Sequence, residues 1–119
     1  MPIAGDILEA LRLELRRGTL ILAVLGTLRS EKYGYTLKTE LGEAGVDIDE
    51  GALYPMLRRL EAQGLLTSEW REDAKRQKRF YRLSPDGAAA LEHLTHEWRA
   101  MNGALDSILT KSGLKERGQ

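Results

Sequence analysis

The basic side chains in the middle of this 119-residue sequence carry its clearest chemical signal. Residues 51–82 hold eight basic and four acidic side chains, residues 1–50 hold six and nine, and residues 83–119 hold four and five. The local charges are therefore +4, −3 and −1, within a chain of zero net charge. Such a distribution indicates that one face meets a polyanion. The predicted phosphate contacts are Arg58, Arg59, Lys75, Arg76, Lys78 and Arg79.

The stretch from residue 49 to residue 64 predicts the helix that presents Arg58 and Arg59. Asp49 is a favoured N-cap residue, and Gly64 is the residue type that a helix favours just past its end. Apolar residues at the i, i+3, i+4 and i+7 spacing predict one buried face, formed by Leu53, Met56, Leu57 and Leu60. The opposite face begins with small residues, which suit entry into a DNA groove. It carries Gly51, Ala52 and Tyr54 ahead of the two arginines.

A histidine cluster near the end of the chain is the second candidate for chemistry. His93 and His96, with Glu92 and Glu97, resemble metal ligands at first sight. The apolar seam of their helix turns Glu92, His93 and His96 outward, and two histidines at i, i+3 without a third fixed ligand favour a solvated face. The sequence also contains no glycine-rich phosphate loop and no nucleophile beside an assignable base. We therefore predict no catalysis, no metal and no cofactor.

Two further helices are predicted ahead of the basic helix. Residues 6–28 form a long helix whose apolar residues recur at heptad-like spacing, namely Leu8, Leu11, Leu15, Gly18, Leu22 and Leu25. Its second half is apolar nearly all round and must be buried, whereas its first half is amphipathic and has nothing local to pack on. Residues 34–44 form a shorter helix, and the tight connection from there to Asp49 has helix-turn-helix spacing.

After Gly64 the sequence changes to β-prone runs. Residues 65–70 and 79–83 predict two strands, with a long polar tip at residues 72–78 between them. Helix, helix and hairpin in this order predict a winged helix-turn-helix, in which the hairpin is the wing. The expected fold class is therefore α+β, mainly α. The segment 71–82 holds six basic and two acidic side chains, a bias that favours phosphate contact over a plain solvated hairpin.

The last predicted element is a long helix that begins with Ser84 as N-cap and Pro85 in its first turn. Its apolar residues form a narrow seam suited to a partner helix, so we expect a homodimer. The predicted units are a winged DNA-binding domain at residues 1–84, a dimerisation helix at residues 85–112 and a frayed tail at residues 113–119. The assigned dimerisation residues are Leu8, Leu91, Leu94, Trp98, Met101, Leu105 and Ile108.

Composition limits where such a protein works. The chain contains no cysteine, which fits a reducing compartment. It shows no charged leader followed by an apolar run, and no apolar run approaches the ~20 residues of a membrane-spanning helix. We expect a cytoplasmic protein that does not enter a membrane.

Several short blocks occur together between residues 15 and 108: Arg17–Leu20, Tyr33–Tyr35, Glu50–Pro55, Arg58–Glu61, Gly64–Leu66 and Lys78–Leu83, followed by Gly87. Together they resemble the PadR-type transcriptional regulators, in particular the compact subgroup that ends in a single long helix. The resemblance implies a homodimer that represses transcription from operator DNA and leaves the DNA when an effector binds.

Tyr35 and Tyr54 could be aromatic residues at the edge of the core, but the resemblance implies DNA-facing hydroxyl groups for both. Two features depart from the family pattern: Ala52 stands where the family usually has Thr, and the wing tip lacks the usual Gly. The first departure removes a hydroxyl from the DNA face. The complete set of predicted DNA contacts is Tyr35, Lys38, Gly51, Ala52, Tyr54, Arg58, Arg59, Lys75, Arg76, Lys78 and Arg79.

Trp98 has two interpretations. The plainer one is packing at the dimer seam, since large aromatic residues dominate interface energies. However, two symmetry-related indoles are too bulky for a tight two-stranded coil, and splayed helices leave a pocket. The resemblance implies that such tryptophans hold a planar aromatic ligand at the dimer axis. The predicted effector-binding residues are Leu11, Leu15, Thr19, Thr95, Trp98 and Asn102.

Two other classes of function compete with a DNA-binding regulator. A winged helix that only binds proteins predicts neither a basic wing nor a strong dimer seam, and this sequence has both. A small metal-dependent enzyme would rest only on the two histidines. The sequence therefore favours a regulator whose partners are double-stranded DNA and a second copy of the chain, and the resemblance adds a planar aromatic effector.

Overall fold

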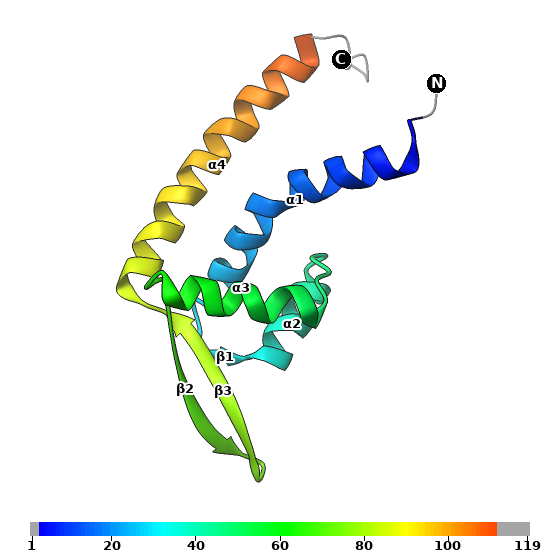
Figure 1. Cartoon of the computed structure of the whole chain (residues 1–119). Helices are drawn as coiled ribbons and strands as arrows, with labels where there is room; N and C mark the ends of the chain where they lie inside the picture. Colours follow the sequence, from blue (N-terminus) through cyan, green and yellow to red (C-terminus); the bar gives the residue numbers. More distant parts are fainter. Residues whose placement is uncertain (1–2, 112–119) are drawn as a thin grey trace.

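The computed structural model describes residues 3–111, so the predicted tail at residues 113–119 lies outside the described residues. A small winged domain carries two long helices that diverge from it (Figure 1). Four helices and a three-stranded sheet confirm the predicted fold class within this range. The elements are α1 (Gly5–Thr27), β1 (Lys32–Tyr33), α2 (Gly34–Glu43), α3 (Glu50–Ala62), β2 (Leu66–Asp73), β3 (Arg76–Leu83) and α4 (Pro85–Lys111).

The hydrophobic core lies where the second half of α1, α2, α3 and the base of the sheet meet. The predicted inward face of α3 is buried, because Leu53 and Leu57 are fully covered and Met56 and Leu60 nearly so. The rest of the core comes from Val24 and Leu25 in α1, Leu28 just after it, Leu37 and Leu41 in α2, and Leu66 and Tyr81 in the sheet. Burial of these side chains positions α3 with its opposite face toward solvent.

Local signals set the ends of α3. The Asp49 carboxylate accepts a hydrogen bond from the backbone N–H of Ala52 at 2.8 Å, which confirms the predicted N-cap. Gly64, just past the end of the helix, has a φ of +83°, a conformation that glycine adopts without steric cost. The helix remains continuous across Pro55.

The hairpin differs from the sequence prediction. The strands pair in the order β1-β3-β2, and β2 and β3 stay in register from Leu66 opposite Leu83 to Asp73 opposite Arg76. The predicted long tip at residues 72–78 is wrong, because the turn consists only of Ala74 and Lys75, with φ of 53° and 66°. Positive φ at both central positions is typical of a type I′ hairpin, whose usual Asn-Gly signal this sequence lacks.

The base of α4 is fixed against the winged domain. Ser84 caps the helix, as predicted: its hydroxyl accepts a hydrogen bond from the N–H of Gly87 at 2.9 Å and donates one to the carbonyl of Gly64. Gly87 is buried, and a Cβ atom at this position would lie 1.9 Å from the carbonyl oxygen of Leu65. The helix therefore approaches the start of the wing more closely than any residue with a side chain allows.

Beyond this base, α1 and α4 run apart (Figure 1). None of the helices within residues 3–111 is both long and apolar enough to cross a membrane. The exposed apolar residues are Ile7, Leu11, Leu13 and Leu15 on α1, and Leu94, Trp98, Met101, Leu105, Ile108 and Leu109 on α4.

Candidate nucleic-acid interface

A groove of about 460 Å³ separates the start of α2 and the outer face of α3 from the wing. Six of the predicted DNA contacts border it, namely Tyr35, Tyr54, Arg58, Arg76, Lys78 and Arg79. The helix-turn-helix and the hairpin, which are separate in sequence, therefore bring these side chains to one surface. The groove also includes Tyr33, Gly34, Trp70, Gln77 and Tyr81.

Several basic side chains near this groove are uncommitted, that is, exposed and without an ion pair or hydrogen bond to another group within residues 3–111. Arg58 and Arg59 are exposed on α3, as are Lys75 and Arg76 at the end of the wing. Within residues 3–111 these four side chains, like that of Lys38 on α2, form no ion pair and no hydrogen bond with another protein group. Such cations keep all their donors for an external anion.

Tyr54 lies at the junction of α2 and α3. Its ring packs against Gly34, where a Cβ atom would come within 2.5 Å of both the Tyr54 Cε1 and hydroxyl oxygen atoms. Burial raises the pKa of Tyr54, and the negative charge of Glu50 raises it further. The hydroxyl therefore stays protonated at neutral pH and can donate a hydrogen bond.

The face of the sheet turned away from α3 carries a row of cations over aromatic rings. Lys78 Nζ lies 4.3 Å from the ring centroid of Tyr33 and 3.1 Å from Asp73 Oδ2, and the hydrogen bond to Asp73 raises the pKa of Lys78. Arg71 lies 4.3 Å from the ring centroid of Phe80 and pairs with Glu31 and Glu69. These contacts hold β1 against the hairpin.

Arg79 points to the opposite face, toward α3. Its Nε donates to Ser68 Oγ at 2.9 Å and its Nη2 donates to Glu61 Oε1 at 3.2 Å. Ser68 Oγ in turn donates to Glu61 Oε2 at 2.8 Å. We call these three side chains the Glu61–Ser68–Arg79 network. Of the predicted phosphate contacts, Arg79 is thus the one whose guanidinium is already bound to a carboxylate of α3.

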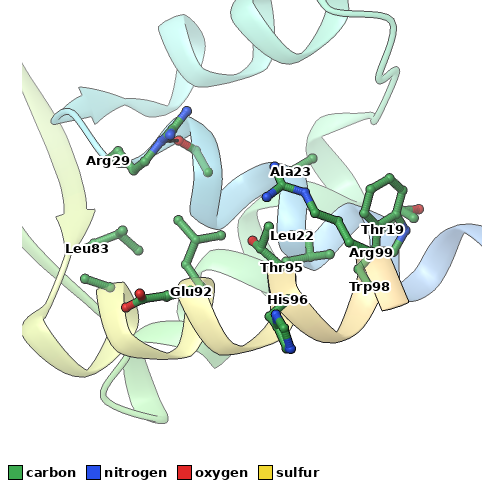
Figure 2. A pocket seen from close by; sticks show the side chains of 13 residues that line it. Thr19, Leu22, Ala23, Arg29, Leu83, Glu92, Thr95, His96, Trp98 and Arg99 are labelled. Atoms are coloured by element: carbon green, nitrogen blue, oxygen red, sulfur yellow. Dashed lines mark hydrogen bonds between the residues drawn. The ribbon is translucent and has the colours of Figure 1, made fainter. Parts of the chain in front are cut away.

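A second groove, of about 810 Å³, lies between α1 and α4. Three of the predicted effector residues line it, namely Thr19, Thr95 and Trp98, whereas Leu11, Leu15 and Asn102 do not. Figure 2 shows Trp98, Thr19 and Arg99 gathered at one end of this groove, with Arg29, Leu83 and Glu92 toward the other. Leu11 and Leu15 lie farther along the diverging part of α1, where they are exposed.

The α1–α4 groove also includes residues that the sequence analysis missed. Arg99 and His96 border it although neither belongs to the apolar seam of α4. Helical periodicity could have indicated them, since Thr95, Trp98 and Arg99 follow one another at i, i+3 and i+4. His93, by contrast, is exposed and lies 3.7 Å from Glu97. Glu92 and His96 are solvent-exposed, as expected, but both border the groove rather than face away from it.

Comparisons with known proteins identify the family of this chain. The model of the transcriptional regulator PadR-like family matches residues 21–93. A curated transcriptional regulator of Mycobacterium tuberculosis is 42% identical over 80 residues, which cover 67% of this chain and 72% of the relative.

Solved structures agree with this match. A PadR family transcriptional regulator from Eggerthella lenta superposes with a TM-score of 0.80 at 39% identity, covering 87% of this chain and 93% of the other. A PadR-like transcription factor from Bacteroides fragilis gives a TM-score of 0.71 at 29% identity, covering 83% and 98%. A helix-turn-helix, a basic wing and a long last helix thus occur together with a family match over more than half of the chain, and the protein belongs to the PadR-like family of transcriptional regulators.

Proposed function

We propose that this regulator is a homodimeric, sequence-specific DNA-binding repressor of the cytoplasm, released from its operator by a planar aromatic effector, and that it is not an enzyme. The DNA-binding part rests on one observation: exposed basic side chains of α3 and of the wing lie near the same groove. Arg58 of α3 and Arg76 of the wing line the same groove, and their sequence neighbours Arg59 and Lys75 are also exposed.

In this proposal α3 enters the major groove of DNA. Its first turn carries Gly51 and Ala52, whose small side chains let the helix approach the base edges. Tyr54, with Tyr35 and Lys38 from α2, contacts the DNA beside them. Arg58 and Arg59, with Lys75, Arg76 and Lys78 of the wing, bind phosphates and fix the orientation of the protein.

The dimer rests on the uncovered apolar faces of α1 and α4. A contiguous apolar surface of this kind is typical of a protein–protein contact, and a second copy of the chain offers the same two faces. We assign the contact to the seam of α4, Leu91 to Ile108, packed against the first half of α1 of the partner, which includes Leu8. Two recognition helices then address half-sites about one helical turn, ~34 Å, apart.

The effector proposal rests on the α1–α4 groove. Its walls combine the Trp98 ring with threonine hydroxyls and apolar side chains, a composition suited to a flat aromatic molecule (Figure 2). Leu11, Leu15 and Asn102 join this site only if dimerisation brings the distal parts of α1 and α4 together. A ligand there changes DNA binding only if it favours one spacing of the two recognition helices.

Binding to a duplex that carries the promoter of the protein's own operon, measured between about 50 and 200 mM salt, tests the DNA proposal. Arg76→Ala removes one phosphate contact per protomer, so the slope of log affinity against log salt should fall by roughly 2 in magnitude for the dimer. Arg12→Ala is a matched control, because it removes the same charge from α1, where Arg12 lies 3.6 Å from Glu9. Equal slopes for Arg76→Ala and the unmodified protein would contradict the contact, and absence of salt-dependent binding to any duplex would favour a protein-interaction module.

A further inference from the structure

The register of the hairpin turns Arg79 toward α3 rather than toward solvent. Trp70 and Arg79 are opposite each other in β2 and β3, as are Ser68 and Tyr81, so these four side chains share one face of the sheet. The Arg79 guanidinium lies 5.6 Å from the Trp70 ring centroid and 5.7 Å from that of Tyr81. Lys75 and Arg76, by contrast, end the hairpin and face solvent.

The Glu61–Ser68–Arg79 network is closed on itself. Each Glu61 carboxylate oxygen accepts one hydrogen bond, from Arg79 and from Ser68 respectively. The Ser68 hydroxyl both donates to Glu61 and accepts from Arg79. Because the side chains of Arg79 and Glu61 are only 36% and 28% exposed, solvent weakens this ion pair less than it would a fully exposed one.

The position of the network gives it a mechanical role. Glu61 lies in the last turn of α3, while Ser68 and Arg79 lie on neighbouring strands of the wing. The chain between Ala62 and Leu66 is the only covalent link from α3 to the wing, and it contains Gly64 at positive φ. Arg76 stands three residues beyond Arg79, about 10 Å farther along the strand, so a small tilt at the network moves the wing tip.

We infer that Arg79 is a positioning residue that, through Glu61 and Ser68, holds the wing at one angle to the recognition helix. The inference rests on the proposed DNA-binding function and replaces the phosphate contact expected of Arg79 from the sequence. The network keeps Lys75 and Arg76 in register with Arg58, so that one DNA duplex meets both basic groups at once. An operator selects this geometry because its bases and phosphates must be reached together.

Removing Glu61 separates the two roles. Glu61→Ala deletes a negative charge near DNA, so a protein in which Arg79 is a phosphate contact should bind DNA as tightly as before or more tightly. A positioning role predicts the opposite result, a loss of operator affinity of about tenfold, the usual scale for a charge-assisted hydrogen bond. Glu72→Ala is the matched control, since Glu72 is an exposed wing carboxylate without a hydrogen bond or ion pair in residues 3–111. It should bind the operator at least as tightly as the unmodified protein.

The salt dependence of Arg79→Ala supplies the second test. We expect Arg79→Ala to lower operator affinity but to leave the slope of log affinity against log salt equal to that of the unmodified protein. Arg76→Ala, by contrast, should reduce this slope. We also expect the losses in Glu61→Ala and Arg79→Ala to be non-additive, with the double variant no weaker than either single variant. A slope reduced by roughly 2 in Arg79→Ala, together with undiminished operator affinity in Glu61→Ala, would overturn the inference.

A readout without DNA keeps this inference separate from the proposed function. The chain has two tryptophans, so Trp98→Phe leaves Trp70 as the only one. In that background Glu61→Ala should release Arg79 from the Trp70 face and speed the decay of Trp70 emission anisotropy, while Glu72→Ala should not. Thermal unfolding confirms that each variant is folded. If the unmodified protein bound no duplex, the DNA-binding proposal would fail, and an unchanged Trp70 decay in Glu61→Ala would overturn the positioning role independently.

Discussion

Gly34 determines where Tyr54 can place its hydroxyl group. The Tyr54 ring occupies the volume in which a side chain at residue 34 would begin. The backbone of Gly34 is not in the left-handed region, so another residue could adopt its conformation without strain. The glycine is therefore required by the neighbouring ring, and through that ring by the surface that we propose meets DNA.

Gly34→Ala tests this dependence. The new methyl group must displace the Tyr54 ring, so we expect a loss of about 1–3 kcal/mol in the free energy of unfolding, as for other overpacked sites. Operator affinity, measured by fluorescence anisotropy, should fall more than affinity for random DNA. In a Tyr54→Ala background the same substitution should cost no further operator affinity.

The control for this experiment lies in the same helix. A Cβ atom at Gly42 would meet only Asp47 Oδ1, at an ordinary 3.8 Å. Gly42→Ala should therefore leave operator binding unchanged and raise the free energy of unfolding by about 0.5–1 kcal/mol, because alanine favours the helix. Gly34→Ala with unchanged operator selectivity would show that Tyr54 does not depend on its neighbour.

At the scale of the elements, one close contact, between Gly87 and the backbone of Leu65, sets the position at which α4 begins. The Cβ of an alanine at residue 87 would lie 1.9 Å from the Leu65 carbonyl oxygen and 3.1 Å from Leu83 Cδ2. The first of these atoms belongs to the backbone at the start of the wing, which cannot rotate away as a side chain can. The direction in which α4 leaves the winged domain, and hence the geometry of the proposed dimer, depends on this contact.

Gly87→Ala should consequently destabilise the protein. We expect a loss of about 1–3 kcal/mol or more in the free energy of unfolding, measured with urea, because the helix must shift away from the wing. Gly103→Ala, in the same helix with nothing within 4 Å of its Cβ position, should be neutral or stabilising. Equal midpoints for the two variants would mean that the base of α4 adjusts without cost.

Prediction from the sequence succeeded for the helices because their signals are local. Asp49 and Ser84 cap their helices as expected, and the spacing from Leu53 to Leu60 identified the buried face of α3. It failed at the hairpin tip, where Ala74 and Lys75 form a tight turn without the usual residues. It missed β1, because two residues carry no measurable periodicity.

The sequence indicated which residue types form the site, but not the direction in which each side chain points. The basic bias of the wing was visible, yet composition could not distinguish Arg79, bound to Glu61, from Arg76, which faces solvent. The difference arises from strand register, since residues three apart point to opposite faces of a sheet. A partner 18 positions away in the sequence leaves no local pattern.

At the scale of the whole molecule, the exposed seam of α4 should control assembly. Leu105 is 46% exposed in the single chain and is assigned to the dimer contact. Leu105→Glu buries a charge there, so we expect the dimer to weaken by at least about 30-fold, as for a substituted interface hot spot. Sedimentation velocity measures this, with Ser107→Glu, off the seam, as control. A Leu105→Glu chain that stayed dimeric at low concentration would contradict the assigned seam.

The groove beside Trp98 gives a second prediction at this scale. A planar aromatic compound that stacks on the indole should quench tryptophan emission, and Trp98→Phe should remove most of the quenching because Trp70 lies in the wing. By linkage, operator DNA and ligand should change each other's affinity by the same factor, ordinarily about 5- to 150-fold. Titration of candidate dyes with and without operator duplex measures that factor. Emission that stays unchanged at high dye concentration would leave Trp98 with a packing role only.

The separation of charge along the chain has a consequence for how the proposed repressor would meet DNA. The +4 segment forms α3 and the wing, whereas the acidic excess of residues 1–50 lies in residues 29–50, which include α2 beside α3 (Figure 1), and the total charge is zero. A distant duplex therefore exerts almost no net pull but does exert a torque, which turns the basic side chains of α3 and the wing forward. Because screening confines this torque to about 8 Å at physiological salt, orientation happens in the last moments of approach. We expect encounters with the wrong face to separate quickly, so that the protein samples DNA by brief, correctly oriented collisions rather than by long non-specific residence.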